Sequence, residues 1–222
     1  MRKHSHRYHL SVITCQLLRR WIFDCDFTSV GASRYLRIMK PEILGTRSIY
    51  KGKIFNVIES DIRHDNLEYK REIVVHKGSA VMVPVYDDGS VALVRQYRYA
   101  AERFLLEIPA GTLNKDEDPE KAALRELEEE IGAKAGKIEK LSEFYVSPGF
   151  LTEKMHLFLA TELMETAQRL EEDEILSIER YSFQEAFGLI RAGEIQDAKS
   201  IIGLMLAGSR LGHVPSWIKQ DA

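Results

Sequence analysis

The segment GTLNKDEDPEKAALRELEEEIGA, residues 111–133, holds eight acidic side chains, six of them glutamates. Asp118 can cap a helix, Pro119 suits the first helical turn, and a glycine such as Gly132 suits a helix end. The segment therefore predicts a helix from about Pro119 to Ile131. So many acids in one helix form either an ordinary solvated face or a cation site, and the arrangement of the glutamates distinguishes the two.

A helical wheel at about 100° per residue places Glu126, Glu129 and Glu130 on one arc, next to an apolar stripe. Carboxylates that share an arc repel one another, and a divalent cation removes this penalty. Oxygen ligands suit Mg²⁺ or Mn²⁺, and Mg²⁺ typically binds through one or two carboxylates together with substrate phosphates. The arc thus predicts a metal site for phosphate chemistry. Glu128 falls on another face and is expected to be solvated, and Glu117 is expected to support the loop before the helix.

The spacing of the fixed residues is more specific than their composition. From Gly111 to Ala133 they follow the order G-x5-E-x7-R-E-L-x-E-E-x-G-A. This order resembles the box of the Nudix hydrolases, G-x5-E-x7-R-E-U-x-E-E-x-G-U, at every position except the last, where a larger aliphatic residue is usual. With seven fixed residues at a background of roughly 6% each, a chance match in this chain is on the order of one in a million. The spacing therefore outweighs the interpretation as a solvated face.

The resemblance implies an α+β protein with the Nudix fold, a mixed β-sheet sandwiched between helices (α/β/α), with an N-terminal antiparallel β-strand region. It also implies hydrolysis of a nucleoside diphosphate linked to another moiety. Glu126, Glu129 and Glu130 would then bind the metal, and Arg125 would orient them by ion pairing. The main-chain carbonyl of Ala110, just before the box, is a metal ligand in similar enzymes. Arg125, Glu129 and Glu130 are the catalytic residues that the box implies.

The flanks of the box narrow the substrate. The resemblance extends from about Lys40 to Leu211, and Pro148, 15 residues past the box, occupies a position that marks the ADP-ribose pyrophosphatase branch. The sequences EIPAG and YKREIVVH are similar to the same branch. The resemblance thus implies cleavage of ADP-ribose to AMP and ribose 5-phosphate. Two alternatives stay open: another substrate, such as an ADP-sugar, a GDP-sugar, NADH or a dinucleotide, and a non-catalytic sensor of ADP-ribose.

Substrate-binding residues are implied by the same resemblance. The positions that match those of the branch are Arg71, Arg98, Glu153 and Pro148. A planar guanidinium suits pyrophosphate oxygens, although a strand arginine is also commonly engaged in a surface ion pair.

The base that activates water is often a glutamate on a loop after the box in this family. Glu174 matches this position best, and Glu172 and Glu153 are alternatives. Tyr97 and Tyr99 are candidates for stacking on adenine, although aromatic strand residues more often belong to the core.

The rest of the chain is dominated by strand patterns. Alternation of apolar and polar residues predicts strands at 54–64, 69–77, 79–86, 91–99, 137–146, 154–163 and 175–183. The turn at Gly89 predicts that the strands on either side of it form a β-hairpin. Helices are predicted near 183–191 and 198–211. This order favours a mixed sheet packed between helices over a doubly wound parallel sheet.

Charge is unevenly distributed along the 222 residues. The formal net charge is -3, and residues 1–38 hold six Arg, one Lys and two Asp, so they carry +5 and the remainder -8. The remainder lacks the basic stripe typical of nucleic-acid binding, so no nucleic-acid partner is expected. No apolar run approaches the roughly 20 residues that cross a bilayer. Cys15 and Cys25 form neither a zinc motif nor a disulfide framework, so the reducing cytoplasm is the expected location.

Residues 1–38 are basic and poor in acids, and a sequence typical of an enzyme's first residues follows at Met39. We expect Met39 to be the physiological start, residues 1–38 to be a non-native or disordered basic prefix, and residues 39–222 to be the Nudix hydrolase domain. A transit peptide and an ordinary mobile arm are the alternatives. The family resemblance also implies a homodimer in which strands at about 46–61 exchange between subunits and complete the adenine pocket.

Overall fold

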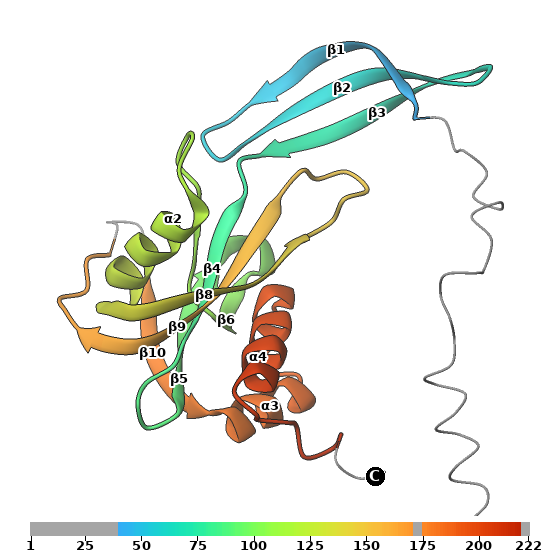
Figure 1. The fold of residues 1–222 in the computed structure, drawn as a ribbon. Helices are drawn as coiled ribbons and strands as arrows, with labels where there is room; N and C mark the ends of the chain where they lie inside the picture. Colours follow the sequence, from blue (N-terminus) through green and yellow to red (C-terminus); the bar gives the residue numbers. More distant parts are fainter. Residues whose placement is uncertain (1–39, 171–174, 219–222) are drawn as a thin grey trace, which may run out of the picture. The chain divides into compact units, whose positions relative to one another are not determined.

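The computed structural model describes residues 40–170 and 175–218 of the chain. The predictions on residues 1–38 and on Met39 as the start lie outside these residues. The described residues from Glu42 onward belong to one unit, whose helices and strands are labelled in Figure 1. Its strands are β1 (Glu42–Lys51), β2 (Phe55–His64), β3 (Leu67–His76), β4 (Ser79–Pro84), β5 (Ser90–Arg98), β6 (Arg103–Glu107), β7 (Ala110–Thr112), β8 (Ala133–Tyr145), β9 (Lys154–Glu165) and β10 (Leu176–Ser182).

The helices of the described residues fall between and after these strands. A 3₁₀ turn covers Tyr99–Ala101, α2 covers Pro119–Glu126, and a π-helical turn at Leu127–Ile131 continues α2. The last two helices are α3 (Phe183–Ala192) and α4 (Ala198–Arg210). None of these helices is long and apolar enough to cross a membrane.

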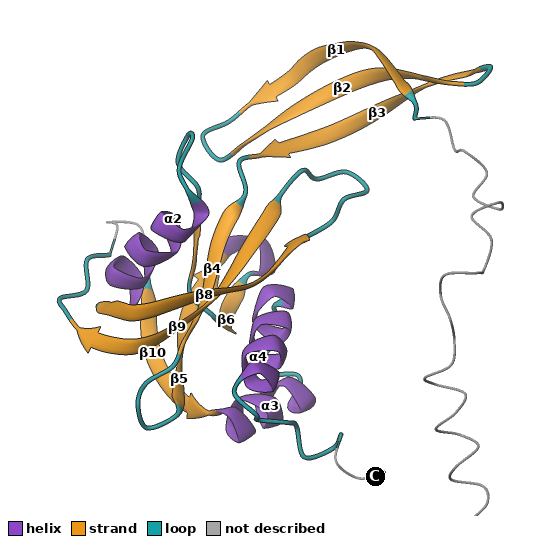
Figure 2. Ribbon diagram, viewed as in Figure 1, coloured by secondary structure: helices purple, strands orange, loops and turns teal. Residues whose placement is uncertain are grey.

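The strands form three sheets (Figure 2). The first is antiparallel with the order β1-β2-β3, and the second is antiparallel with the order β10-β5-β6. The third has the order β7-β4-β9-β8 and is mixed, because β4 and β9 run parallel. The mixed sheet and the N-terminal antiparallel region that the sequence predicted are therefore both present.

The alternation of side chains along β4 divides the core into two layers. Val81 and Val83 lie in one buried cluster with Leu204 of α4, whereas Met82 lies in a second cluster with Leu127 at the end of α2. Because successive strand residues point to opposite faces, one strand packs against helices on both sides. The α/β/α arrangement predicted from the sequence is confirmed.

The box helix begins and ends at the predicted residues. The Asp118 carboxylate accepts hydrogen bonds from the main-chain N–H groups of Glu120 and Lys121, at 3.0 and 3.2 Å, and Pro119 opens the helix. Gly132 ends it in the left-handed conformation, with φ of 65°. The sequence did not predict that the last turn would be π-helical. Such turns occur frequently at functional sites.

The turn at Gly89 forms as predicted, but the prediction that its flanking strands form a β-hairpin is wrong. The turn itself forms, because the Tyr86 N–H donates to the Ser90 carbonyl at 2.9 Å. However, β4 and β5 belong to different sheets, and only Val85 and Val91 pair across the turn. Both edges of β4 are occupied by β7 and β9, and both edges of β5 by β6 and β10, so neither strand has an edge left for the other. The residues of the turn do not determine which strands pair with β4 and β5.

Candidate active site

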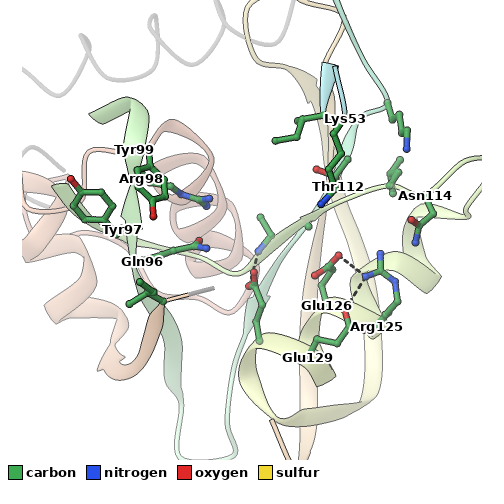
Figure 3. Close-up of a pocket in the computed structure, with 17 residues that line it drawn as sticks. Lys53, Gln96, Tyr97, Arg98, Tyr99, Thr112, Asn114, Arg125, Glu126 and Glu129 are labelled. Carbon is green, nitrogen blue, oxygen red and sulfur yellow. Dashed lines mark hydrogen bonds and ion pairs between the residues drawn. The ribbon is translucent and has the colours of Figure 1, made fainter. Parts of the chain in front are cut away.

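A pocket of about 740 Å³ contains the carboxylates of the box helix. It is bounded by the box helix, by β7 and the loop after it, by the end of β5, and by the turn between β1 and β2 (Figure 3). The lining residues are Lys53, Ile54, Lys77, Gln96, Tyr97, Arg98, Tyr99, Ala110, Gly111, Thr112, Leu113, Asn114, Arg125, Glu126, Glu129, Glu130 and Ile175.

Arg125 holds three carboxylates in place. Its Nε and Nη2 donate to the two oxygens of Glu117 at 3.0 and 3.1 Å. Its Nη1 donates to Glu126 at 2.7 Å and to Glu129 at 2.9 Å, as the dashed lines in Figure 3 show. A guanidinium carries five N–H donors in one plane, so this single side chain can bind all three carboxylates at once. Arg125 thus pairs with the carboxylates that the family resemblance expects it to orient.

Glu126 and Glu130 are buried, at 8% and 3% exposure. The Ala110 N–H donates to a Glu130 oxygen at 3.2 Å, which joins β7 to the π-helical turn. Glu126 packs on the backbone of Gly111 so closely that a Cβ there would lie 1.8 Å from the Glu126 Cδ. The close contact with Glu126 therefore requires a glycine at position 111.

Of two further glutamates in the segment, Glu117 supports the loop as expected, whereas Glu128, which was expected to be solvated, is only 22% exposed and ion-paired. Glu117 accepts a hydrogen bond from the Asn114 N–H at 2.7 Å, in the loop before the helix. Glu128 does not line the pocket; it forms ion pairs with Arg169 and with Lys134, in the latter case at 3.7 Å. One helical segment thus separates carboxylates that face the pocket from one that does not.

The opposite wall of the pocket carries Arg98 and the aromatic pair (Figure 3). Arg98 donates from Nε and Nη2 to the two oxygens of Glu107, at 2.9 and 2.7 Å. Tyr97 and Tyr99 both line the pocket, and their rings meet edge to face at 5.2 Å between centroids. Tyr99 is 79% exposed, so its ring is open to a ligand.

The ion pairs shift the pKa values of several groups in the site. Hydrogen bonding to Glu117 raises the pKa of Arg125 against the opposing effect of burial, and the charge of Glu126 raises it further. The bond from Arg125 lowers the pKa of Glu117. Burial alone would raise the pKa of Glu107, but hydrogen bonding to Arg98 and the nearby charge of Lys199 hold it below its usual value. The two pocket arginines are thus fixed cations near neutral pH.

The donor set agrees in kind with a hard divalent cation. Carboxylates and main-chain carbonyls are the ligands that such cations prefer, and the pocket offers Glu126, Glu129, Glu130 and Ala110. Across residues 40–170 and 175–218, however, no three His, Cys, Asp or Glu side chains are already gathered closely enough to hold a metal ion. Binding of one cation by all three box carboxylates would therefore need side-chain rotation, for which the 38% exposed Glu129 side chain has room.

Three predicted substrate-binding residues do not line this pocket. Arg71 lies on β3, where its guanidinium stacks over Tyr69 at 4.4 Å from the ring centroid. Glu153 accepts a hydrogen bond from the Ser79 hydroxyl at 2.7 Å, and Pro148 lies exposed in the loop between β8 and β9.

The candidate bases Glu174 and Glu172 lie outside the described residues.

Several pocket residues carried no signal in the sequence. Lys53 and Lys77 add two cations to the lining, and Gln96, Thr112 and Asn114 add hydrogen-bonding groups. Thr112 and Asn114 fall on unspecified positions of the box, and the lysines look like ordinary surface residues. Only the path of the chain between β1 and β4 brings the lysines to the pocket.

A protein-family model described as NUDIX domain matches residues 76–202, which is more than half of the 222 residues. The chain therefore belongs to the Nudix family and is a Nudix pyrophosphohydrolase, as the box predicted. Nudix hydrolases in general depend on divalent metal ions.

Several relatives match most of the chain, among them two from Bacillus. The ADP-ribose pyrophosphatase of Bacillus subtilis (strain 168) is 39% identical over 168 residues, covering 74% of this chain and 91% of that protein. The methanol dehydrogenase activator of Bacillus methanolicus is 36% identical over 171 residues, covering 76% and 92%. A crystal structure of an ADP compounds hydrolase superposes with a TM-score of 0.69 at 24% identity, covering 79% of this chain and 96% of that one. That likeness concerns the fold alone.

Proposed function

We propose that this protein hydrolyses the pyrophosphate bond of ADP-ribose, giving AMP and ribose 5-phosphate, with Mg²⁺ or Mn²⁺ as the metal. The observation that carries the proposal is the pocket itself, where the box carboxylates and the Arg98 wall enclose one space of about 740 Å³. Identity of 39% with a protein named ADP-ribose pyrophosphatase supports the choice of substrate. The two cysteines of the sequence, Cys15 and Cys25, do not form the kind of disulfide framework typical of secreted proteins, which supports the reducing cytoplasm as its compartment.

The chain's residues have distinct roles in this proposal. Glu126, Glu129, Glu130 and the Ala110 carbonyl would hold the metal, which neutralises pyrophosphate oxygens and lowers the pKa of a bound water. Arg125 keeps two of these carboxylates oriented through Nη1.

On the opposite wall, the Arg98 guanidinium would bind pyrophosphate oxygens, because its planar fork matches two oxygens at once. Tyr97 and Tyr99, which flank it in sequence and line the pocket, would stack on the adenine. The recognition of the nucleotide and the reactive centre are thus assigned to different walls.

Glu174 remains our choice for the base that takes the proton from the attacking water. Ile175, which directly follows it, lines the pocket, whereas Glu153 does not. A test compares Glu174→Gln with Glu153→Gln: the first should lower kcat far more than the second. The reverse order would transfer the role to Glu153.

We also propose a homodimer formed through the N-terminal sheet. Side chains on β1, on the following turn and on β3 leave large apolar surfaces exposed, with exposures of 63% for Ile43, 53% for Ile49, 62% for Ile54 and 69% for Leu67. Apolar side chains that gather on one exposed element can mark an interaction surface. Exchange of this sheet would also bring Arg71 toward a partner's pocket. Light scattering on the purified protein should give twice the chain mass, and a monomer at micromolar concentration would contradict this.

The substrate is tested by a screen on the purified full chain. kcat/KM is measured with Mg²⁺ for ADP-ribose, ADP-glucose, GDP-mannose, NADH and a dinucleoside polyphosphate, and the products are identified by chromatography. ADP-ribose should be among the best substrates and should yield AMP and ribose 5-phosphate. A clear preference for another compound, or hydrolysis that needs no divalent metal, would overturn the proposal.

A further inference from the structure

A buried polar network lies behind the Arg98 wall of the pocket. Glu107 is 1% exposed, Lys199 6% and Ser200 0%. Burying charged groups is costly unless they are paired and hydrogen-bonded. Neither Glu107 nor Lys199 lines the pocket, so neither is accounted for by the roles proposed above.

The network runs from the pocket to the first turn of α4. Glu107 accepts hydrogen bonds from Arg98 Nε at Oε1 and from Arg98 Nη2 at Oε2, and Oε2 also forms an ion pair with Lys199 Nζ. Lys199 also donates to the Asp197 carboxylate at 2.9 Å. Asp197 caps α4 by accepting from the Ser200 N–H at 3.0 Å.

The same turn of α4 is connected to the strand that leads into the box. The Ile108 N–H donates to the Ser200 hydroxyl oxygen at 2.8 Å, and that hydroxyl donates to Asp197 at 2.5 Å. Ile108 follows Glu107 and comes two residues before Ala110 and Gly111, which line the pocket. The position of Glu107 is therefore fixed from two directions.

The charges of the network explain why two cations are needed. Arg98 and Lys199 each carry +1, and both pair with the single charge of Glu107, while Lys199 also pairs with the partly exposed carboxylate of Asp197. If Arg98 were the sole partner of Glu107, any movement of Arg98 toward a phosphate would leave a buried carboxylate uncompensated, which is strongly unfavourable. With Lys199 in place, Glu107 stays compensated while Arg98 shares its charge with a substrate.

The geometry of the guanidinium is consistent with such sharing. Glu107 engages Nε and Nη2 of Arg98, and not Nη1. The guanidinium carries five N–H donors in a fixed plane, so holding one edge directs the other. Since Arg98 lines the pocket, the edge not engaged by Glu107 is the one offered to the ligand.

We propose that Lys199 is a positioning residue for substrate binding, which acts through Glu107 to hold Arg98 available to the pyrophosphate of the substrate. The inference rests on the proposed function, since it needs a diphosphate ligand in the pocket. It extends the functional residues to the first turn of α4, which is about 90 residues away from Glu107 in sequence.

The test is a double-mutant cycle in kinetic parameters. Lys199→Met is made alone and together with Arg98→Ala, and KM and kcat are measured with the nucleoside diphosphate derivative that the wild type hydrolyses fastest. Lys199→Met alone should raise KM about tenfold with little change in kcat, because it weakens binding in ground state and transition state alike. In the Arg98→Ala background the same substitution should leave KM unchanged.

Two further variants separate positioning from folding. Lys199→Arg keeps the charge and should restore most of the KM. Arg210→Met removes a cation from the other end of α4, where Arg210 pairs with Glu139 at 2.7 Å, and should leave KM unchanged. If Lys199→Met does not fold, Lys199→Gln, which keeps an N–H donor without the charge, takes its place.

Each outcome decides the question. An equal rise in KM with and without Arg98, or a lower melting temperature with unchanged KM, would overturn the inference and leave Lys199 a structural residue. A wild type that hydrolyses no nucleoside diphosphate derivative would refute the proposed function itself, and that result is visible before any variant is made.

Discussion

Glu126 can lie where it does only because Gly111 has no side chain. A Cβ on Gly111 would stand 1.8 Å from both Cδ and Oε1 of Glu126. The glycine at the first position of the box is therefore explained by its contact with a carboxylate fifteen positions later. The arginine of the box is explained by a second contact, since Arg125 Nη1 donates hydrogen bonds to Glu126 and Glu129.

Gly111→Ala should impair activity more than stability. The added methyl group displaces the Glu126 carboxylate, which is the flexible end of a side chain, so the free energy of unfolding should fall by only about 1 kcal/mol. Displacement of a site group by about 1 Å can lower the rate about 100-fold, and kcat should fall to that degree. Gly188→Ala is the control: a Cβ there meets nothing within 4 Å, so it should keep kcat and slightly raise the melting temperature. Normal kcat in Gly111→Ala would contradict the account.

At the scale of secondary structure, features set by neighbouring residues were predictable and those set by distant partners were not. Asp118 and Gly132 mark the ends of the box helix in both the sequence and the structure. The sequence did not predict the short strand β7, because its pairing with β4 is decided by tertiary contacts. The hairpin at Gly89 failed for the same reason, since each strand finds other partners.

The end of the box helix gives a prediction about stability. Gly132 and Gly193 both adopt positive φ, 65° and 75°, at helix ends. A Cβ at Gly193 has only a Gln196 side-chain atom nearby, at 3.9 Å, whereas at Gly132 it would lie 3.0 Å from the backbone of Thr166 and of Gln168. Gly193→Ala should cost about 1 kcal/mol for its left-handed conformation, and Gly132→Ala clearly more. Urea unfolding of the two variants measures this, and equal losses would show that the contact at Gly132 is unimportant.

At the scale of the whole molecule, the sequence predicted the box residues of the pocket better than the residues on its other walls. The box residues lie next to one another on one helix, so their spacing alone brings them together. Arg98 and Lys199 come from distant parts of the chain, and no local pattern relates them. Arg71 and Glu153 match the branch in sequence but do not line the pocket of a single chain. The predicted role of Arg71 depends on the proposed dimer.

The buried network predicts how stability varies with pH. Since the folded pKa of Glu107 lies below its usual value, its ionised form stabilises the fold above the unfolded pKa, roughly 4.3, and this contribution is lost as pH falls through the folded value. Glu107→Gln should therefore be less stable than the wild type at pH 7 and lose less of its stability on acidification. Urea unfolding between pH 7 and pH 3 gives both curves. Parallel curves would show that Glu107 does not contribute to the acid sensitivity.

The central claim is that the carboxylates facing the pocket, and not the acidity of the helix as such, catalyse the hydrolysis of ADP-ribose. The most direct test compares Glu129→Gln with Glu128→Gln, neighbours in the same π-helical turn of which only Glu129 lines the pocket. The measurement is kcat for ADP-ribose with saturating Mg²⁺. Glu129→Gln should lower kcat at least about 100-fold, because a metal ligand contributes several kcal/mol to the rate, and Glu128→Gln should stay close to the wild type. Near-normal turnover in Glu129→Gln, or an equal loss in both, would contradict the account.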